Sequence, residues 1–163
     1  MGRRTTLARV SLTHVDESGA ARMVDVSGKE ASAREAVATA FFRCAPEVVE
    51  LLRANALSKG DALATARIAG IMAAKRTPDL VPLCHPIALS SVVVDLEVVD
   101  DGVVVTVTAR TTDRTGVEME ALTAAAVAGL TLHDMVKAVD PAATLTDLRV
   151  ERKSGGKTGE WTR

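Results

Sequence analysis

The chain has 163 residues, which is close to one domain, because single domains commonly run about 100–150 residues. Hydrophobic residues make up 47%, enough for a core and too many for a disordered chain. The 20 Lys and Arg against 21 Asp and Glu give a formal net charge of −1, so nucleic acid is not an expected partner. Aromatic residues make up 2%, which argues against a protein that binds single-stranded nucleic acid by stacking its bases on aromatic side chains.

The cysteine content and the N-terminal residues indicate in which compartment the protein works. Cys44 and Cys84 form neither a disulfide framework nor a CxxC zinc motif, so we expect a reduced, cytoplasmic protein. Residues 1–12 are basic but lack the apolar stretch of a signal peptide. They predict a flexible leader ahead of a single domain over residues 13–160. No run of about 18 apolar residues is present, so no membrane partner is expected.

Apolar spacing, turn residues and helix caps predict the elements. Pro46 suits a first helical turn, Asp61 suits an N-cap, and Asp101-Gly102 is a hairpin signal. In chain order we expect a strand over 23–26, helices over 31–43, 46–54 and 62–76, strands over 91–99 and 103–112, a helix over 116–139 and a strand over 144–151.

This order is the split β-α-β pattern of ferredoxin-like folds, with an extra N-terminal helix at 31–43. We therefore expect an α+β protein in which helices pack on one face of an antiparallel sheet. The strands over 91–99 and 103–112 alternate polar and apolar residues, which predicts one covered face and one wet face. The helix over 62–76 is rich in alanine and should lie close to the sheet or to a partner helix.

The long helix over 116–139 carries a polar stripe when it is unrolled at 100° per residue. Asp134 and Lys137 are i, i+3 neighbours that can touch. The stripe is either a solvated face or a rigid carboxylate–ammonium pair that can move protons. Its members are Glu120, Thr123, Thr131, Asp134 and Lys137.

The segment Pro82-Leu83-Cys84-His85-Pro86 holds one imidazole between two prolines. His85 is either a satisfied structural histidine or a proton-transfer group that works near neutral pH. A Cys84–His85 nucleophile pair is disfavoured, because adjacent extended residues point to opposite sides. His14, His85 and His133 have no partner at ligand spacing, so no metal site is expected.

Several cations could bind an anion. Lys59 precedes a helix, and a cation is electrostatically disfavoured at a helix N-terminus. Either Lys59 helps to bind an anion that docks on the free N–H groups, or it is simply an exposed lysine. Arg34, Lys153 and Lys157 are further anion binders if the fold brings them together. The tail around Lys157 is not a P-loop, because Glu151 stands where the motif needs its first glycine and no helix follows.

From Leu12 to Gly159 the chain resembles the molybdenum cofactor biosynthesis protein C family, whose members are cyclic pyranopterin monophosphate synthases. The resemblance is carried by four blocks: LTHVDESGAARMVDVSGKE, KGDALATARIAGIMAAKRTPDLVPLCHPIALS, GVEMEALTAAAVAGLTLHDMVKAVD and KSGGKTG. It implies a lyase that converts the triphosphate 3′,8-cyclo-7,8-dihydroguanosine 5′-triphosphate to cyclic pyranopterin monophosphate and diphosphate. It also implies a homo-oligomer, a hexamer built as a trimer of dimers, with active sites at the dimer interface. No cofactor is expected; Mg²⁺ could accompany the triphosphate, but no carboxylate cluster marks a site for it.

The resemblance transfers functional roles to matching positions. The implied catalytic residues are Lys59, His85, Asp134, Lys137 and Lys153. The implied substrate-binding residues are Leu83, Cys84, His85, Glu118, Met119, Glu120 and Arg34, to which the glycine-rich tail adds Lys157. Our hypothesis gives Asp134 and Lys137 the general acid and base roles, Lys59 and Lys153 the phosphates or the ring-opening step, and His85 a positioning or protonating role.

One position departs from the family pattern, and two other classes of function compete. Residue 133 is His where the family suggests an aromatic such as Tyr, and it lies about 100° round the helix from Asp134. A non-catalytic nucleotide-binding regulatory domain would use Lys59 and the tail for phosphate. It would leave Asp134, Lys137 and His85 without a task. A purely structural oligomer would explain the alanine-rich helices but not the PLCHP and KSGGK segments.

Overall fold

The computed structural model describes residues 15, 16, 18–157 and 159–163. The basic leader expected over residues 1–12 lies outside these residues, so its separation from a domain over 13–160 stays a prediction.

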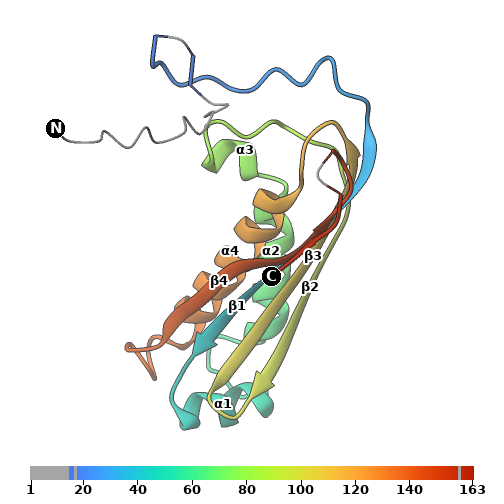
Figure 1. Cartoon of the computed structure of the whole chain (residues 1–163). Helices are drawn as coiled ribbons and strands as arrows, with labels where there is room; N and C mark the ends of the chain where they lie inside the picture. The colour runs from blue at the N-terminus through green and yellow to red at the C-terminus, as the bar shows by residue number, and fades with distance from the viewer. Residues whose placement is uncertain (1–14, 17, 158) are drawn as a thin grey trace, which may run out of the picture.

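The described chain forms a five-stranded antiparallel sheet with helices on one face (Figure 1). The strand order is β2-β3-β1-β4-β5. Four long strands with α2 and α4 reproduce the β-α-β-β-α-β order, which confirms the α+β, ferredoxin-like class. The elements are β1 (Ser32–Arg43), α1 (Pro46–Arg53), α2 (Ala62–Ala74), α3 (Thr77–Leu80), β2 (Leu89–Val99), β3 (Gly102–Asp113), α4 (Glu118–Val136), β4 (Thr144–Ser154) and β5 (Trp161–Thr162).

The helix expected over 31–43 is wrong: these residues form β1, a central strand paired with β3 and β4. Ala36, Ala38 and Phe42 are fully buried, and the residues between them are more exposed, which is the period of a strand. Alanine favours helices, but pairing on both edges overrides that preference. The described residues therefore hold no extra N-terminal helix; the additional helix, α1, lies between β1 and α2.

The strand expected over 23–26 is also wrong. Residues 22–26 have no regular structure, although the turn at Ser27-Gly28 is present. The alternation in Met23-Val24-Asp25-Val26 reflects side chains that line a pocket rather than a sheet, as described below.

The remaining elements are confirmed within a few residues. The side chain of Asp61 caps α2 by accepting a hydrogen bond from the backbone N–H of Ala64 at 2.9 Å. The Asp101-Gly102 turn joins β2 and β3. The helix expected to end near Thr77-Pro78 ends at Ala74, and a four-residue helix, α3, follows it.

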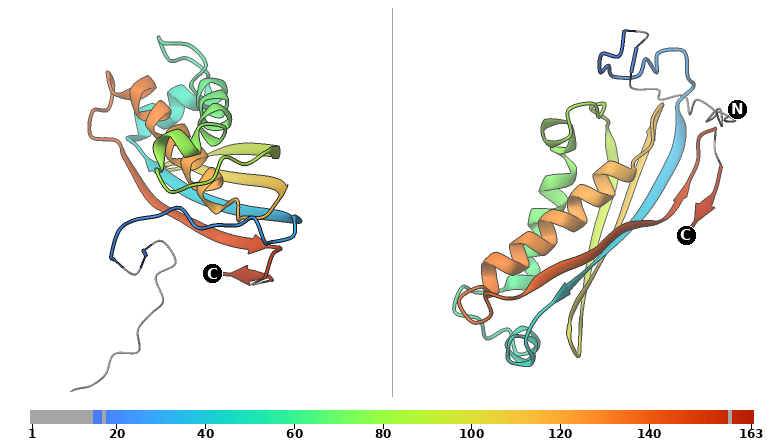
Figure 2. Two further views of the ribbon diagram at one scale, coloured as in Figure 1. Left: turned by 90° about the horizontal axis from the view of Figure 1, so that it is seen from above. Right: turned by 60° about the vertical axis from the view of Figure 1, so that its left-hand side comes forward.

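Small residues bring α2 close to α4, as the alanine content predicted. A Cβ on Gly70 would lie 3.0 Å from the carbonyl oxygen of Ala124 and 3.4 Å from the Cβ of Ala128. Both helices run along one face of the sheet, and α4 follows its length (Figure 2). The core between the layers is made mainly of Ala, Val and Leu and includes Phe42 near the end of β1.

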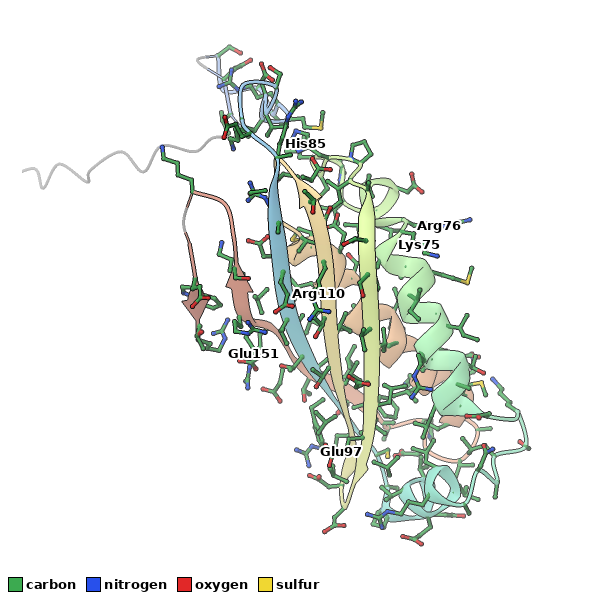
Figure 3. The ribbon with its side chains drawn as sticks, turned by 90° about the vertical axis from the view of Figure 1, so that its right-hand side faces the viewer. Lys75, Arg76, His85, Glu97, Arg110 and Glu151 are labelled. Carbon is green, nitrogen blue, oxygen red and sulfur yellow. The ribbon has the colours of Figure 1, made fainter. Side chains whose placement is uncertain are left out.

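No helix of the described residues covers the opposite face of the sheet, which is polar, as the alternating strands predicted. Figure 3 looks onto this face, where Arg110 and Glu151 are labelled. Glu35 bridges two arginines there: Arg110 at 2.6 Å and Arg152 at 2.5 Å. Among the described residues, no helix is long and apolar enough to cross a membrane.

Candidate active site

A pocket of about 420 Å³ lies where the PLCH segment meets the start of α4. The segment from Leu83 to His85 forms one wall, and the residues from Glu118 to Glu120 form another. These two stretches are about 35 residues apart in the chain, and packing of α2 and α3 beside α4 brings them together. The structure thus places six of the expected substrate-binding residues around one cavity, although their roles stay predictions.

Glu120 is a buried acid in the wall of this pocket. It is only 3% exposed, yet it lines the cavity. Burial raises the pKa of Glu120 to about 7, and the nearby Glu118 carboxylate raises it further. A carboxyl group with a pKa near 7 can both donate and accept a proton at neutral pH, which suits acid–base chemistry.

Cys84 shares the pocket but is a poor nucleophile. Burial and the Glu120 carboxylate raise the pKa of its thiol. The thiolate is the reactive form of cysteine, so this surrounding agrees with the expectation that a Cys84–His85 nucleophile pair is disfavoured.

His85 is anchored to the N-terminal segment that borders the pocket. Its Nε2 lies 2.7 Å from the carbonyl oxygen of Val24, which can only accept, so Nε2 donates this hydrogen bond. The bond fixes the orientation of the ring. In Figure 3, His85 lies at the end of the molecule away from α1.

Lys153 and Arg34 flank a smaller polar cavity of about 160 Å³ next to the pocket. The Nζ of Lys153 donates to Glu118 at 2.9 Å across the boundary between the two cavities. Arg34 donates to the carbonyl oxygens of Asp113 and Arg114 at 2.9 and 3.2 Å. The structure therefore brings these two expected anion binders together, whereas Lys157 is exposed in the turn that follows β4.

A second cluster is centred on Asp134, near the C-terminal end of α4. Its carboxylate binds Lys137 at 2.7 Å, which confirms the expected i, i+3 pair, and Lys59 at 3.1 Å. Lys59 also donates to the backbone oxygen of Asp134 at 2.6 Å. The Lys137 and Lys59 ammonium groups hold the pKa of Asp134 below its usual range. Asp134 is therefore an ionised acceptor between two proton donors.

The two clusters do not meet within the chain. Glu120 and Asp134 share α4, but they are 14 positions apart, which corresponds to about 21 Å of helix rise. The polar stripe expected on this helix thus joins a buried acid at one end to an exposed, doubly paired acid at the other.

Sequence reasoning missed several pocket residues. Val24, Val26 and Lys29 line the main cavity from the N-terminal segment, and Thr115 and Gly116 line it just before α4. Lys29 lies within the block MVDVSGKE, so the resemblance held a signal for it. The described residues contain no group of three or more His, Cys, Asp or Glu side chains placed to hold a metal ion.

His133 faces away from this chemistry. Its Nδ1 lies 3.1 Å from the carbonyl oxygen of Ala143, and its ring meets Phe42 edge-on, with the centroids 6.5 Å apart. The side chain ties the end of α4 to the core and to the start of β4, which is a structural role.

Fold and site together define an α+β, ferredoxin-like protein whose cavities combine proton donors and acceptors with cations suited to a phosphorylated ligand. Residues 23–156 match the model of one family, and the chain belongs to it: the MoaC family.

Close relatives cover nearly the whole chain. It is 68% identical over 152 residues to a protein of Streptomyces coelicolor named cyclic pyranopterin monophosphate synthase, covering 93% of this chain and 89% of the relative. A protein of the same name from Streptomyces avermitilis is 65% identical over 96% of this chain and 92% of its own length. Cyclic pyranopterin monophosphate synthase 2 of Mycobacterium tuberculosis is 59% identical over 93% of this chain and 91% of its own length.

Proposed function

We propose that the chain is a cyclic pyranopterin monophosphate synthase, a lyase of molybdenum cofactor biosynthesis. It converts 3′,8-cyclo-7,8-dihydroguanosine 5′-triphosphate to cyclic pyranopterin monophosphate and diphosphate. The observation that carries the proposal is the convergence of Leu83–His85 and Glu118–Glu120 on one pocket, at whose edge Glu118 is bound by Lys153. The relatives named for this activity support the same reaction.

The cations near the pocket suit the triphosphate. Lys153 and Arg34 line the same small cavity beside the main pocket, so phosphates placed there would meet two positive charges. Lys157 lies a few residues further along the same tail and could approach the outer phosphate. Diphosphate leaves when a sugar hydroxyl attacks the inner phosphorus, and positive charge stabilises that leaving group.

The proton transfers need donors and acceptors at neutral pH. Asp134 is held ionised by Lys59 and Lys137, and each ammonium can donate a proton while Asp134 accepts one. His85 and Glu120 offer the same exchange inside the pocket. The overall reaction is a rearrangement that expels diphosphate, with no net oxidation or reduction, so the proposal assigns no redox cofactor.

The assembly is part of the proposal. A homo-oligomer, a hexamer built as a trimer of dimers, would let the Asp134 cluster of one subunit complete the pocket of another. The support is the separation of the two clusters along α4, which leaves each chain with two half-sites. The two free cysteines support a reduced compartment, the cytoplasm.

Turnover by the purified protein tests the function. We expect incubation with the cyclic dihydroguanosine triphosphate to release diphosphate and to produce a pterin chromophore. Tight binding of this compound without diphosphate release would instead favour the non-catalytic nucleotide-binding domain. A Lys59→Ala variant with full turnover would contradict the role of the second cluster.

A further inference from the structure

Trp161, the only tryptophan of the chain, lies beside the expected phosphate site. In the sheet, β5 pairs with β4 so that Trp161 is directly opposite Lys153. Directly opposed residues of an antiparallel pair project from the same face, with their Cβ atoms about 4.5–5.5 Å apart. Lys153 reaches Glu118 at the start of α4, so Trp161 also projects toward the helix-covered face.

The indole ring borders a cavity that continues from the site. This cavity of about 400 Å³ is lined by Glu118, Val150, Lys153, Glu160 and Trp161. Glu118 also lines the pocket of His85, and Lys153 also lines the small cavity of Arg34. The Lys153–Glu118 ion pair thus stands where the three cavities meet.

The ring of Trp161 is available to a ligand. The Arg163 guanidinium lies over the ring, 5.7 Å from its centroid, but the residue still keeps 41% of its surface exposed. Directly after β4, Gly155 has a φ of +90°, and a Cβ there would clash with the carbonyl oxygen of Ala33. The pairing of β5 with β4 is what places Trp161 opposite Lys153.

We propose that Trp161 stacks on the purine-derived ring of the substrate while Lys153 and Arg34 hold its phosphates. The inference rests on the proposed function, and it supplies the aromatic contact that a chain with 2% aromatic residues otherwise lacks. Flat rings stack on indole faces through dispersion and electrostatic complementarity, and the contact tolerates changes in the base.

Intrinsic fluorescence tests the stacking directly, because all tryptophan emission of the chain comes from Trp161. We use GTP as the probe, since it carries a purine ring and a triphosphate, and inorganic tripolyphosphate as its ring-free control. Stacking predicts saturable quenching by GTP and little change with tripolyphosphate. Equal quenching by both compounds, or none by GTP, would overturn the proposal.

Two variants at Trp161 distinguish stacking on an aromatic ring from simple filling of space by the side chain. Trp161→Leu should weaken GTP binding and raise KM by about 5–100-fold with little change in kcat, whereas Trp161→Phe should stay close to the parent. Phe41→Leu is the matched control, because Phe41 also lies under an arginine, Arg43 at 5.0 Å, but on the open face of the sheet. Equal losses in Trp161→Leu and Trp161→Phe would contradict stacking.

The two proposals fail in different ways. If the wild-type protein turns over the cyclic substrate but Trp161→Leu keeps its KM and its GTP affinity, the stacking inference is wrong and the function stands. If no diphosphate is released but GTP binding depends on the ring of Trp161, the function is wrong and the stacking stands. Circular dichroism of each variant checks that the fold is retained.

Discussion

Glu120 and Asp134 lie on the same helix, α4, in opposite surroundings: Glu120 is buried in a pocket wall, and Asp134 is exposed between Lys59 and Lys137. About 21 Å of helix rise separates them, so one chain cannot present both to one small substrate. If both are needed for turnover, the reacting site combines the two ends of α4 from different subunits.

Mixed oligomers test this arrangement. Glu120→Gln and Asp134→Asn should each be nearly inactive alone, because every site then lacks one group. In a refolded or co-expressed mixture, half of the dimers carry one of each subunit, and each of these has one intact site. Activity should therefore recover to up to about a quarter of the wild-type value. A mixture no more active than its components would contradict a site shared between subunits.

Loss of the Asp134 charge should impair the chemistry. Asp134→Asn removes an ionised acceptor that binds two lysines, and we expect kcat to fall by about 10²–10⁴-fold, the usual contribution of a general acid or base. Steady-state diphosphate release measures the effect. Asp147→Asn is the matched control, because Asp147 is as exposed as Asp134 and also faces a cation, Arg149. Equal losses in both variants would point to a general charge effect.

Burial of Glu120 should make the stability of the protein depend on pH. Its pKa is about 7 in the folded protein against 4.5 for a free glutamate, so the folded state holds a proton that the unfolded state releases. The contribution of Glu120 to the free energy of unfolding is fully present below pH 4.5. It is lost as the pH rises toward 7, by up to about 3 kcal/mol.

Urea unfolding of the wild type and Glu120→Gln at pH 5 and pH 8 measures this effect. Because glutamine stays neutral, the variant should gain stability relative to the wild type on going from pH 5 to pH 8. A constant difference between the two proteins across this range would show that Glu120 titrates normally.

The turn after β4 should tolerate one glycine substitution better than another. Gly155→Ala forces a Cβ to within 2.1 Å of the Ala33 carbonyl oxygen at a φ of +90°, so it should cost more than the about 1–2 kcal/mol of a left-handed alanine. Gly159→Ala has a φ of +67° but open space around it, and should cost only that backbone term. Thermal unfolding measures the difference.

Emission from Trp161 reports whether β5 detaches from β4 in these two variants. We expect a red shift in Gly155→Ala, because the indole loses its place opposite Lys153, and little change in Gly159→Ala. Similar unfolding temperatures and spectra for the two variants would show that the contact with Ala33 is unimportant.

Local patterns in the sequence determined most of the fold. The Asp61 cap, the Asp101-Gly102 turn and the alternating valines of β2 and β3 each depend on neighbours along the chain, so they could be recognised from the sequence. The i, i+3 pairing of Asp134 with Lys137 is local in the same sense. The resemblance supplied the expected site residues, because it rests on long blocks of matching residues.

Only the tertiary structure decided the features that depend on distant partners. Ala36 and Ala38 favour a helix by propensity, but pairing with β3 and β4 makes them a strand. Glu120 acquired its raised pKa from burial, which no local pattern predicts. Trp161 reached Lys153 through the strand pairing of the tail. The sequence by itself determined the residue types and the local elements, whereas long-range packing decided which groups meet, because contact and burial are properties of the folded chain.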